Sequence, residues 1–292
     1  MRSALSTLEL VRPRSLAAAL GALHESLAAE RLTPLAGGTD LFVYLNAGAF
    51  AGRRYLDLLP LSELRGIRVR RDGVRIGALA SFREIRTHVV LRRRFPALVA
   101  AAAEVGAWQI QCRATLAGNI ANASPAGDSL PVLLAHDAIV RARSVRGERT
   151  IEFGKLFRGY RDLDLAPDEL IAEIELPEPP HGAIPFFRKV GTRRAQSISK
   201  VVFCGLGALG RGGALEGVRL AYGSVAPVPL RAIRAEAALE GRRPDAAAAA
   251  AAREALELDI APIDDIRSDR EYRMTVAGNV LEQFLRTLRG AR

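Results

Sequence analysis

One glycine-containing loop could hold a phosphate group. It reads Leu35-Ala36-Gly37-Gly38-Thr39-Asp40, and it joins an expected strand, 32–36, to an expected helix, 40–47. Paired glycines let a ligand approach the backbone closely, and successive N–H groups can then point at an anion. The start of a helix adds partial positive charge, and Thr39 can donate a hydroxyl hydrogen bond. Since a carboxylate would repel phosphate, we expect Asp40 to cap the helix; a tight turn with a cap is the alternative interpretation.

A second segment, 115–128, carries small residues between hydrogen-bonding ones, and we expect it to form a loop. Its length and scarcity of charge favour contact with a ligand, which would satisfy the backbone groups of a buried loop. The alternative is a surface loop in which Asp128 caps the helix that begins near Ser129. The side chains able to bind a sugar or a phosphate are Thr115, Asn119, Asn122, Ser124 and Asp128.

A third glycine pattern, Gly-Leu-Gly-Ala-Leu-Gly at 205–210, matches the dinucleotide fingerprint G-x-G-x-x-G only formally. In that fingerprint the last glycine opens a helix that faces the pyrophosphate. Here Arg211-Gly212-Gly213 follows, and then another strand-like run. We therefore interpret this pattern as a β-hairpin with a glycine-rich turn.

Composition excludes several kinds of chemistry. The two cysteines, Cys112 and Cys204, cannot supply the four thiolates of an iron–sulfur cluster, and the four histidines show no metal-ligand spacing. The net charge is +10, but the basic residues are scattered and lack aromatic interleaving, so we expect no nucleic-acid partner. A basic chain instead favours acidic protein partners.

Hydropathy places the chain away from the membrane. No apolar run approaches the roughly 20 residues that span a bilayer, so we expect no membrane span. Residues 1–20 contain no continuous apolar stretch of the secretory type, and the cytoplasm is the expected location.

The pattern of elements predicts two parts that meet near Pro177. The first mixes helices and strands, with Ser15 as a helix N-cap, and the second has strands first and helices after, which is an α+β pattern. Expected in the first part are helices at 14–30, 40–47, 82–106 (interrupted at Pro96) and 129–136, and strands at 32–36, 54–58, 67–71, 74–79, 138–144 and 169–176. Expected in the second are strands at 185–190, 198–209 and 214–224, and helices at 229–240, 245–257 and 270–288.

The two loops resemble those of a known family, the FAD-binding (medium) subunits of molybdenum hydroxylases of the xanthine dehydrogenase and aerobic carbon monoxide dehydrogenase type. Ala36 to Leu41 is similar to its first loop and Thr115 to Asp128 to its second, with Ala117 where the family usually has glycine. The resemblance continues in order along the chain at Gln109–Thr115, Glu173–Pro177, Phe187–Arg194, Ile198–Val201, Ala221–Pro227 and Arg267–Arg273.

This resemblance implies a fold and a domain division. The fold would be α+β: a two-lobed FAD-binding domain of the vanillyl-alcohol-oxidase type, then a C-terminal domain of antiparallel sheet packed with helices. The FAD-binding domain would span 1–177, with lobes of about 1–57 and 58–177, and the C-terminal domain would span 178–292.

It also implies the cofactor-binding residues. Gly37, Gly38 and Thr39 would hold the pyrophosphate together with Gly118 and Asn119, while Ile171 and Gly106 would flank the isoalloxazine. Lys189 would sit near the polar edge of the ring, where a cation stabilises negative charge; an exposed lysine beside Arg188 is the alternative. The remaining expected contacts are Leu35, Ala36, Asp40 and Leu41 in the first loop, and Thr115, Ser124 and Asp128 along the phosphates and ribityl chain.

The function implied is electron transfer through non-covalent FAD, because neither loop offers a histidine or cysteine for attachment. Electrons would come from [2Fe–2S] clusters in a small partner subunit, fed by a molybdenum cofactor in a large one, and would leave to NAD or another acceptor. The assembly implied is a dimer of heterotrimers, and this chain would supply no catalytic side chain. Two alternatives stay open: a self-contained flavin oxidoreductase of the same fold, and a non-catalytic nucleotide-binding or assembly protein.

Overall fold

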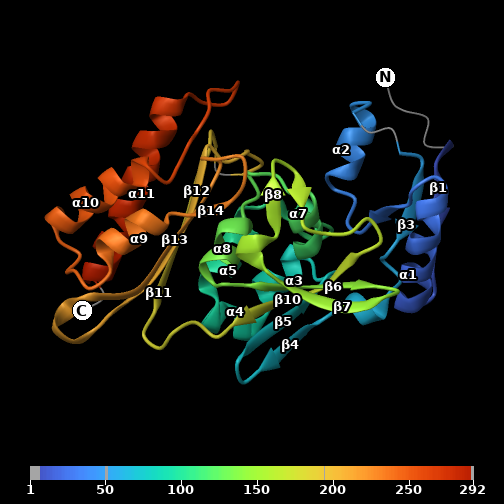
Figure 1. The fold of residues 1–292 in the computed structure, drawn as a ribbon, viewed down its shortest axis with the longest axis horizontal. Coiled ribbons are helices and arrows are strands. Elements are labelled where there is room, and N and C mark those ends of the chain that lie inside the picture. The colour runs from blue at the N-terminus through green and yellow to red at the C-terminus, as the bar shows by residue number, and fades with distance from the viewer. Residues whose placement is uncertain (1–6, 50–51, 194, 291–292) are drawn as a thin grey trace.

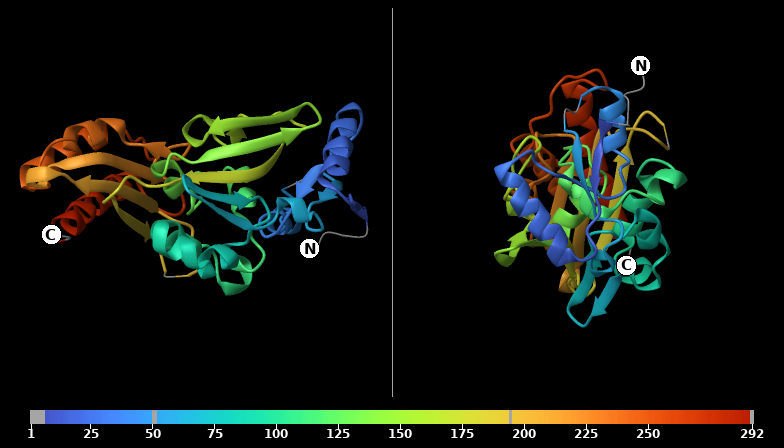
Figure 2. Two further views of the ribbon diagram at one scale, coloured as in Figure 1. Left: turned by 90° about the horizontal axis from the view of Figure 1, so that it is seen from below. Right: turned by 90° about the vertical axis from the view of Figure 1, so that its right-hand side faces the viewer.

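Three sheets follow one another along the long axis of the molecule (Figure 1), and the left view of Figure 2 shows the same order. The computed structural model describes residues 7–49, 52–193 and 195–290. Residues 1–6, 50–51, 194 and 291–292, which belong to the expected domains 1–177 and 178–292, lie outside the described residues. None of the described helices is long and apolar enough to cross a membrane.

The first sheet carries the glycine loop. Its order is β1-β3-β2, and both strand pairs are parallel. The helix expected at 14–30 ends at Glu25, with Ser15 capping it by accepting a hydrogen bond from the N–H of Ala18. The elements of this part are β1 (Glu9–Val11), α1 (Leu16–Glu25), β2 (Thr33–Leu35), α2 (Leu41–Asn46) and β3 (Arg54–Asp57).

The second sheet is antiparallel, in the order β4-β5-β10-β6-β7. Apolar side chains on one of its faces, among them Ile76, Val140 and Ile174, are buried in the same core as Phe82 and Leu116 from the helices. The strands are β4 (Ile67–Arg70), β5 (Gly73–Gly77), β6 (Ile139–Ser144), β7 (Gly147–Glu152) and β10 (Leu170–Pro177), with a small hairpin of β8 (Phe157–Gly159) and β9 (Asp162–Leu163) between β7 and β10. The sequence interpretation had missed β7, β8 and β9.

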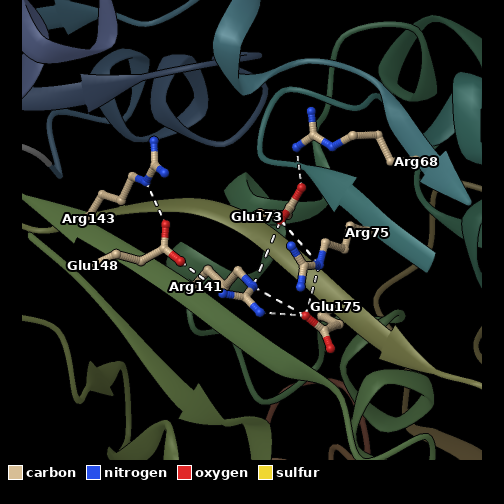
Figure 3. A network of polar contacts seen from close by, with 7 residues as sticks. All are labelled: Arg68, Arg75, Arg141, Arg143, Glu148, Glu173 and Glu175. Atoms are coloured by element: carbon tan, nitrogen blue, oxygen red, sulfur yellow. Dashed lines mark hydrogen bonds and ion pairs between the residues drawn. The ribbon is translucent and has the colours of Figure 1, made fainter. Parts of the chain in front are cut away.

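The other face of this sheet carries a network of ion pairs (Figure 3). Glu175 on β10 binds Arg75 on β5 at 3.0 Å and Arg141 on β6 at 2.9 Å, so one carboxylate joins three neighbouring strands. Glu173 lies between the same two arginines and also pairs with Arg68. These shared carboxylates help to specify the register, because slippage of β10 would move them away from the arginines of both neighbouring strands.

A buried carboxylate ties the first sheet's helix to this central part. Asp168 is almost fully buried and accepts hydrogen bonds from His24 of α1, at 3.0 Å, and from Arg146. Mainly because of the Arg146 guanidinium, the pKa of this carboxyl lies well below its usual range. The contact fixes the position of the part that carries the glycine loop.

The stretch 82–106 is three helices, not one helix interrupted at Pro96. The interruption at Pro96 is present, as expected, and Pro96 begins a new helix, but the chain also breaks at His88, whose ring caps the helix that follows. A capping box between Ser81 and Glu84 starts the first of them. The helices of this part are α3 (Phe82–Thr87), α4 (Val89–Arg94), α5 (Pro96–Glu104), α6 (Trp108–Gln111), α7 (Leu116–Ala121) and α8 (Leu130–Ala135).

The expectation that all of 115–128 is loop was wrong, because α7 occupies its first half. Thr115 caps this helix by accepting a hydrogen bond from the N–H of Gly118 at 3.0 Å. Glycine and asparagine have low helix propensity, which hid the helix from the sequence. Its buried residues Leu116 and Ile120 anchor it in the core, so packing overrides propensity.

The C-terminal part follows the expected order of sheet and then helices. Its antiparallel sheet runs β11-β12-β13-β14, and the glycine-rich pattern at 205–210 leads into a hairpin turn, as expected. A Cβ at Gly205 would lie 2.8 Å from the ring of Phe284, so glycine lets that ring pack on the sheet. The elements are β11 (Ile184–Val190), β12 (Val201–Leu209), β13 (Leu215–Gly223), β14 (Leu230–Arg231), α9 (Ile233–Leu239), α10 (Ala246–Glu257) and α11 (Arg270–Gly290).

His136, at the end of α8, should make stability depend on pH. It is buried against Phe95, and neither ring nitrogen has a hydrogen-bond partner among the described residues. Burial, helped by the charge of Arg219, lowers its pKa from 6.5 to about 4. The unfolded chain therefore binds the proton more readily, so this contribution to stability is complete above pH 6.5 and is lost as the pH falls toward 4.

The free energy of unfolding should fall between pH 7 and pH 4.5 in the wild type. In His136→Leu this fall should be smaller by about 2–3 kcal/mol, measured by urea unfolding at both pH values. Asp128, whose raised pKa acts with the opposite sign in this window, is present in both proteins and cancels. The exposed His181 provides the control, because His181→Leu should change nothing. An equal loss in the wild type and the His136→Leu variant would contradict the assignment.

Candidate functional site

A cavity of about 1,200 Å³ lies where the three parts of the molecule meet. Its walls come from segment 33–44, from segment 105–128 with β10, and from loops of the C-terminal part at 196–199 and 224–227. The volume reaches past the usual range of about 300–1,000 Å³ for small-molecule sites, so a long ligand fits. The predicted site residues that line it are Leu35, Ala36, Gly37, Gly38, Thr39, Asp40, Leu41, Gly106, Thr115, Gly118, Asn119, Ser124, Asp128 and Ile171.

The first loop presents backbone donors to this cavity. The N–H groups of Gly37, Gly38, Thr39 and Asp40 make no hydrogen bond to another described residue. A Cβ at Gly37 would overlap the carbonyl oxygen of Arg113. Because glycine has no Cβ, the loop can pack closely against the chain just before the second segment. Gly38 has φ of 74°. Glycine is therefore required at Gly37 by lack of space and at Gly38 by the backbone conformation, and the loop amides are free to bind an anion.

Asp40 does not cap the following helix, contrary to expectation. Its side chain makes no capping hydrogen bond, and its backbone is already helical, with φ of −88° and ψ of −42°, whereas a capping residue is usually extended. Desolvation raises the pKa of its carboxyl, although the residue keeps solvent contact, and the charge of Arg161 opposes that rise. Because α2 has only six residues, the loop amides matter more than a helix dipole.

The second segment brings a polar row to the opposite wall. Asn119 accepts a hydrogen bond from Ser129 at 2.7 Å through its side-chain oxygen, which leaves its amide NH₂ available. Ala117, where the family usually has glycine, is buried in the core and also borders the cavity. Its methyl group therefore packs against protein as well as facing the site.

Lys189 is the one predicted site residue that does not line the cavity. It is not the exposed lysine of the alternative interpretation either, because its side chain is only 4% exposed. Its ammonium donates to Asp128 Oδ2 at 2.6 Å and to the carbonyl oxygen of Glu104 at 3.0 Å. The lysine thus acts on the site through Asp128, which does line it.

Asp128 has an acceptor left over at the cavity wall. Its Oδ1 is buried and accepts no well-formed hydrogen bond from a described residue, although the Ser199 hydroxyl lies close enough to favour the ionised carboxylate. Burial raises the pKa of this carboxyl to about 6, and Lys189 opposes the rise. Since unsatisfied buried oxygens are rare in folded proteins, a hydroxyl group of a bound ligand is the expected partner.

The wall from the C-terminal part is held by strained backbone. Gln196 has a φ of 51° and donates its backbone N–H to the carbonyl oxygen of Gly106. Ser224 has a φ of 65°, and its hydroxyl oxygen lies 3.0 Å from that of Ser199. Non-glycine residues at such angles are uncommon and cluster at functional sites. Sequence reasoning did not assign Gln196, Ser199 and Ser224 to the site, because the sequence carries no signal of backbone strain.

Polar side chains from two further elements meet at the cavity wall and were also missed. Tyr44 of α2 donates its hydroxyl to Asn122 at 3.0 Å, and Arg161 of the β8–β9 turn donates to the same hydroxyl at 3.0 Å. All three residues line the cavity. Asn122 had been noted as a hydrogen-bonding residue, but nothing in the sequence brings Arg161 close to it.

The cavity therefore combines a loop with free backbone amides, a carboxylate with an acceptor left over and an apolar region. The apolar region comes from Val105, Ile110 and Leu165 beside Ile171. Residues 6–179 match the family described as the FAD binding domain in molybdopterin dehydrogenase, and residues 186–288 match the CO dehydrogenase flavoprotein C-terminal domain. The chain belongs to this family of FAD-binding oxidoreductase subunits.

Individual relatives agree with the family. The xanthine dehydrogenase FAD-binding subunit of Escherichia coli O157:H7 is 32% identical over 243 residues, which cover 82% of each chain. The carbon monoxide dehydrogenase medium chain of Hydrogenophaga pseudoflava is 27% identical and covers 86% of this chain and 87% of its own. A solved structure of that enzyme, in a form lacking the Mo-pyranopterin moiety, superposes with a TM-score of 0.90 at 27% identity, over 94% of this chain and 95% of the other.

FAD fits the cavity by the chemistry of its walls. The free amides of Gly37 to Asp40 match a pyrophosphate, and the unpaired Oδ1 of Asp128 matches a ribityl hydroxyl. The apolar walls around Ile171 match an aromatic ring system.

Replacing Gly38 by valine should abolish FAD binding without unfolding the chain. A Cβ at this position would lie 2.9 Å from the Phe42 ring, and a β-branched residue resists a positive φ. We expect the affinity for FAD to fall at least about 100-fold, measured by flavin fluorescence with the apoprotein, since close contact with phosphate leaves no room for a side chain.

Gly48 provides the matched control for backbone strain. Its φ is 67°, but a Cβ there would meet nothing within 4 Å, and it does not line the cavity. Gly48→Val should therefore lose stability as Gly38→Val does while it keeps FAD. Full FAD occupancy in a folded Gly38→Val protein would show that the first loop is only a turn.

Proposed function

We propose that this chain holds one FAD without a covalent bond and transfers electrons within a heteromeric molybdenum hydroxylase. The electrons would come from [2Fe–2S] clusters in a small partner subunit, supplied by a molybdenum cofactor in a large partner subunit, and would pass to NAD or another acceptor. The observation that carries the proposal is a cavity with free loop amides at one wall and apolar side chains at another, in a chain of this family.

The side chains supply binding and orientation. The amides of Gly37 to Thr39, with Gly118 and Asn119, would hold the pyrophosphate. Asp128, kept in place by Lys189, would accept hydrogen bonds from the ribityl hydroxyls, and Lys189 would add positive charge behind that wall. Ile171 and Gly106 would flank the isoalloxazine, whose reversible reduction is the chemistry that bound FAD supplies.

The wider organisation follows as part of the same proposal. The two-lobed arrangement of the vanillyl-alcohol-oxidase type would comprise residues 1–57 and 58–177, and the C-terminal domain would comprise 178–292. Support comes from the separate sheets of these parts and from the two family matches, which meet between 179 and 186. A cytoplasmic dimer of heterotrimers is the proposed assembly.

Denaturation should release all of the flavin. None of the described residues that line the cavity is a histidine or a cysteine, two residue types that commonly attach flavins covalently. We expect acid or heat precipitation of the flavin-loaded protein to leave all yellow colour in the supernatant. Flavin absorbance that remains with the washed precipitate would contradict non-covalent binding.

The isolated chain should have negligible hydroxylase activity. Among the described residues that line the cavity, Asp128, Asp40, Glu169 and Asp265 are the carboxylates, and Asp128 and Asp265 are already engaged by Lys189 and Arg273. We expect substrate to reduce the flavin anaerobically only when the large and small partner subunits are added. Equal turnover by the isolated chain and by the mixture would instead favour a self-contained flavin oxidoreductase.

A further inference from the structure

The β8–β9 hairpin carries a cation into the cavity wall without a carboxylate partner. Three cations line the cavity within the described residues: Arg161, Arg267 and Arg273. The last two pair with Asp265, at 3.7 and 2.7 Å. Arg161 makes no such pair in the described part of the chain, and its guanidinium instead donates to the hydroxyl of Tyr44.

Arg161 is held at this position by two aromatic rings. Its guanidinium carbon lies 5.3 Å from the ring centroid of Tyr44 and 5.8 Å from that of Tyr160. Tyr44 also donates to Asn122, which immediately follows α7, so one hydroxyl joins the hairpin to both loop-bearing segments. Figure 1 labels the three elements, α2, α7 and β8.

The backbone at Arg161 is strained. Arg161 has φ of 54°, an angle that costs a non-glycine residue free energy unless surrounding contacts compensate. Glycine at this position would relieve the strain but would remove the charge. A strained backbone that carries a guanidinium without a carboxylate partner to a cavity wall points to a ligand contact.

The charge of Arg161 acts on the glycine loop. It opposes the rise that desolvation causes in the pKa of the Asp40 carboxyl, at the end of the row of free amides that begins at Gly37. A pyrophosphate on those amides would lie beside the Asp40 carboxylate and would need a cation. Guanidinium is suited to phosphate, because its planar N–H groups can donate two parallel hydrogen bonds.

We propose that the β8–β9 turn closes over the phosphates of the bound dinucleotide, with Arg161 as a direct phosphate ligand and Tyr44 as the residue that positions it. This rests on the proposed function, and it adds a third contact to the two glycine-bearing segments. The site would then discriminate by phosphate content as well as by the ring system, and release of the cofactor would require the turn to move off Tyr44.

The test compares FAD with ADP, which has the pyrophosphate but no isoalloxazine. In Arg161→Gln, the Kd for FAD and the inhibition constant of ADP competing with FAD should both rise about 10- to 100-fold, the loss expected for a hydrogen bond to a charged group. Raising the salt concentration should weaken FAD binding more in the wild type than in this variant. The Kd of Tyr44→Phe for FAD should lie between those of the wild type and Arg161→Gln, and this variant should release FAD faster than the wild type does.

Arg158 on the same hairpin is the matched control. It is exposed, does not line the cavity and donates to the carbonyl oxygen of Leu163, so Arg158→Gln should bind FAD and ADP as the wild type does. Arg161→Lys keeps the charge without the fork and should lose about 3- to 10-fold for both ligands, which preserves the test if Arg161→Gln does not fold.

Two outcomes would overturn the proposal. Unchanged FAD and ADP affinity in Arg161→Gln and Arg161→Lys would show that the arginine belongs to the turn without contacting the ligand. Weaker FAD binding with unchanged ADP competition would show that it acts on the ring and not on the phosphates. Failure of the wild-type chain to bind FAD at all would refute the proposed function instead, so the two failures are distinguishable.

Discussion

The buried pair of Lys189 and Asp128 is the contact on which the rest of the site depends. It joins β11 of the C-terminal part to the segment between α7 and α8, and the same ammonium holds the carbonyl oxygen at the end of α5. A buried charge that loses its partner destabilises a protein by about 3–5 kcal/mol, so separating these segments carries a large cost. The wall made by Gln196, Ser199 and Ser224 has its position because this pair fixes the sheet behind it.

Much of the fold could be predicted because local patterns determined it. The strands expected at 67–71 and 74–79 are present as the hairpin of β4 and β5, and the strand expected at 169–176 is present as β10. The glycine loop was recognisable since paired glycines between a strand and a helix allow the positive φ and the close backbone approach that a tight loop needs. The order of sheet and helices after Pro177 followed from periodicity alone. Elements were predicted correctly where the hydrophobic periodicity and the turn residues pointed to the same secondary structure.

The failures have a different physical origin. Helix α7 was hidden because Gly118 and Asn119 are poor helix formers, and its stability comes from the burial of Leu116 and Ile120 against a sheet far along the chain. Arg161 could not be placed because its partner, Tyr44, is separated from it by 117 residues. Lys189 was expected beside the flavin ring, but it lies buried behind Asp128, and that position depends on how two parts of the chain pack, which no short pattern encodes.

The meeting of three separately built parts around one cavity links the lifetime of the subunit to the supply of its cofactor. A ligand that contacts the folded arrangement alone stabilises it by RT ln(1 + [L]/Kd), so each tenfold rise in free cofactor above Kd adds about 1.4 kcal/mol. Here the ligand would touch the first sheet, the central part and the C-terminal loops together. Newly made chains would thus persist or be degraded according to flavin availability, before any partner subunit arrives, which makes cofactor loading a checkpoint for assembly.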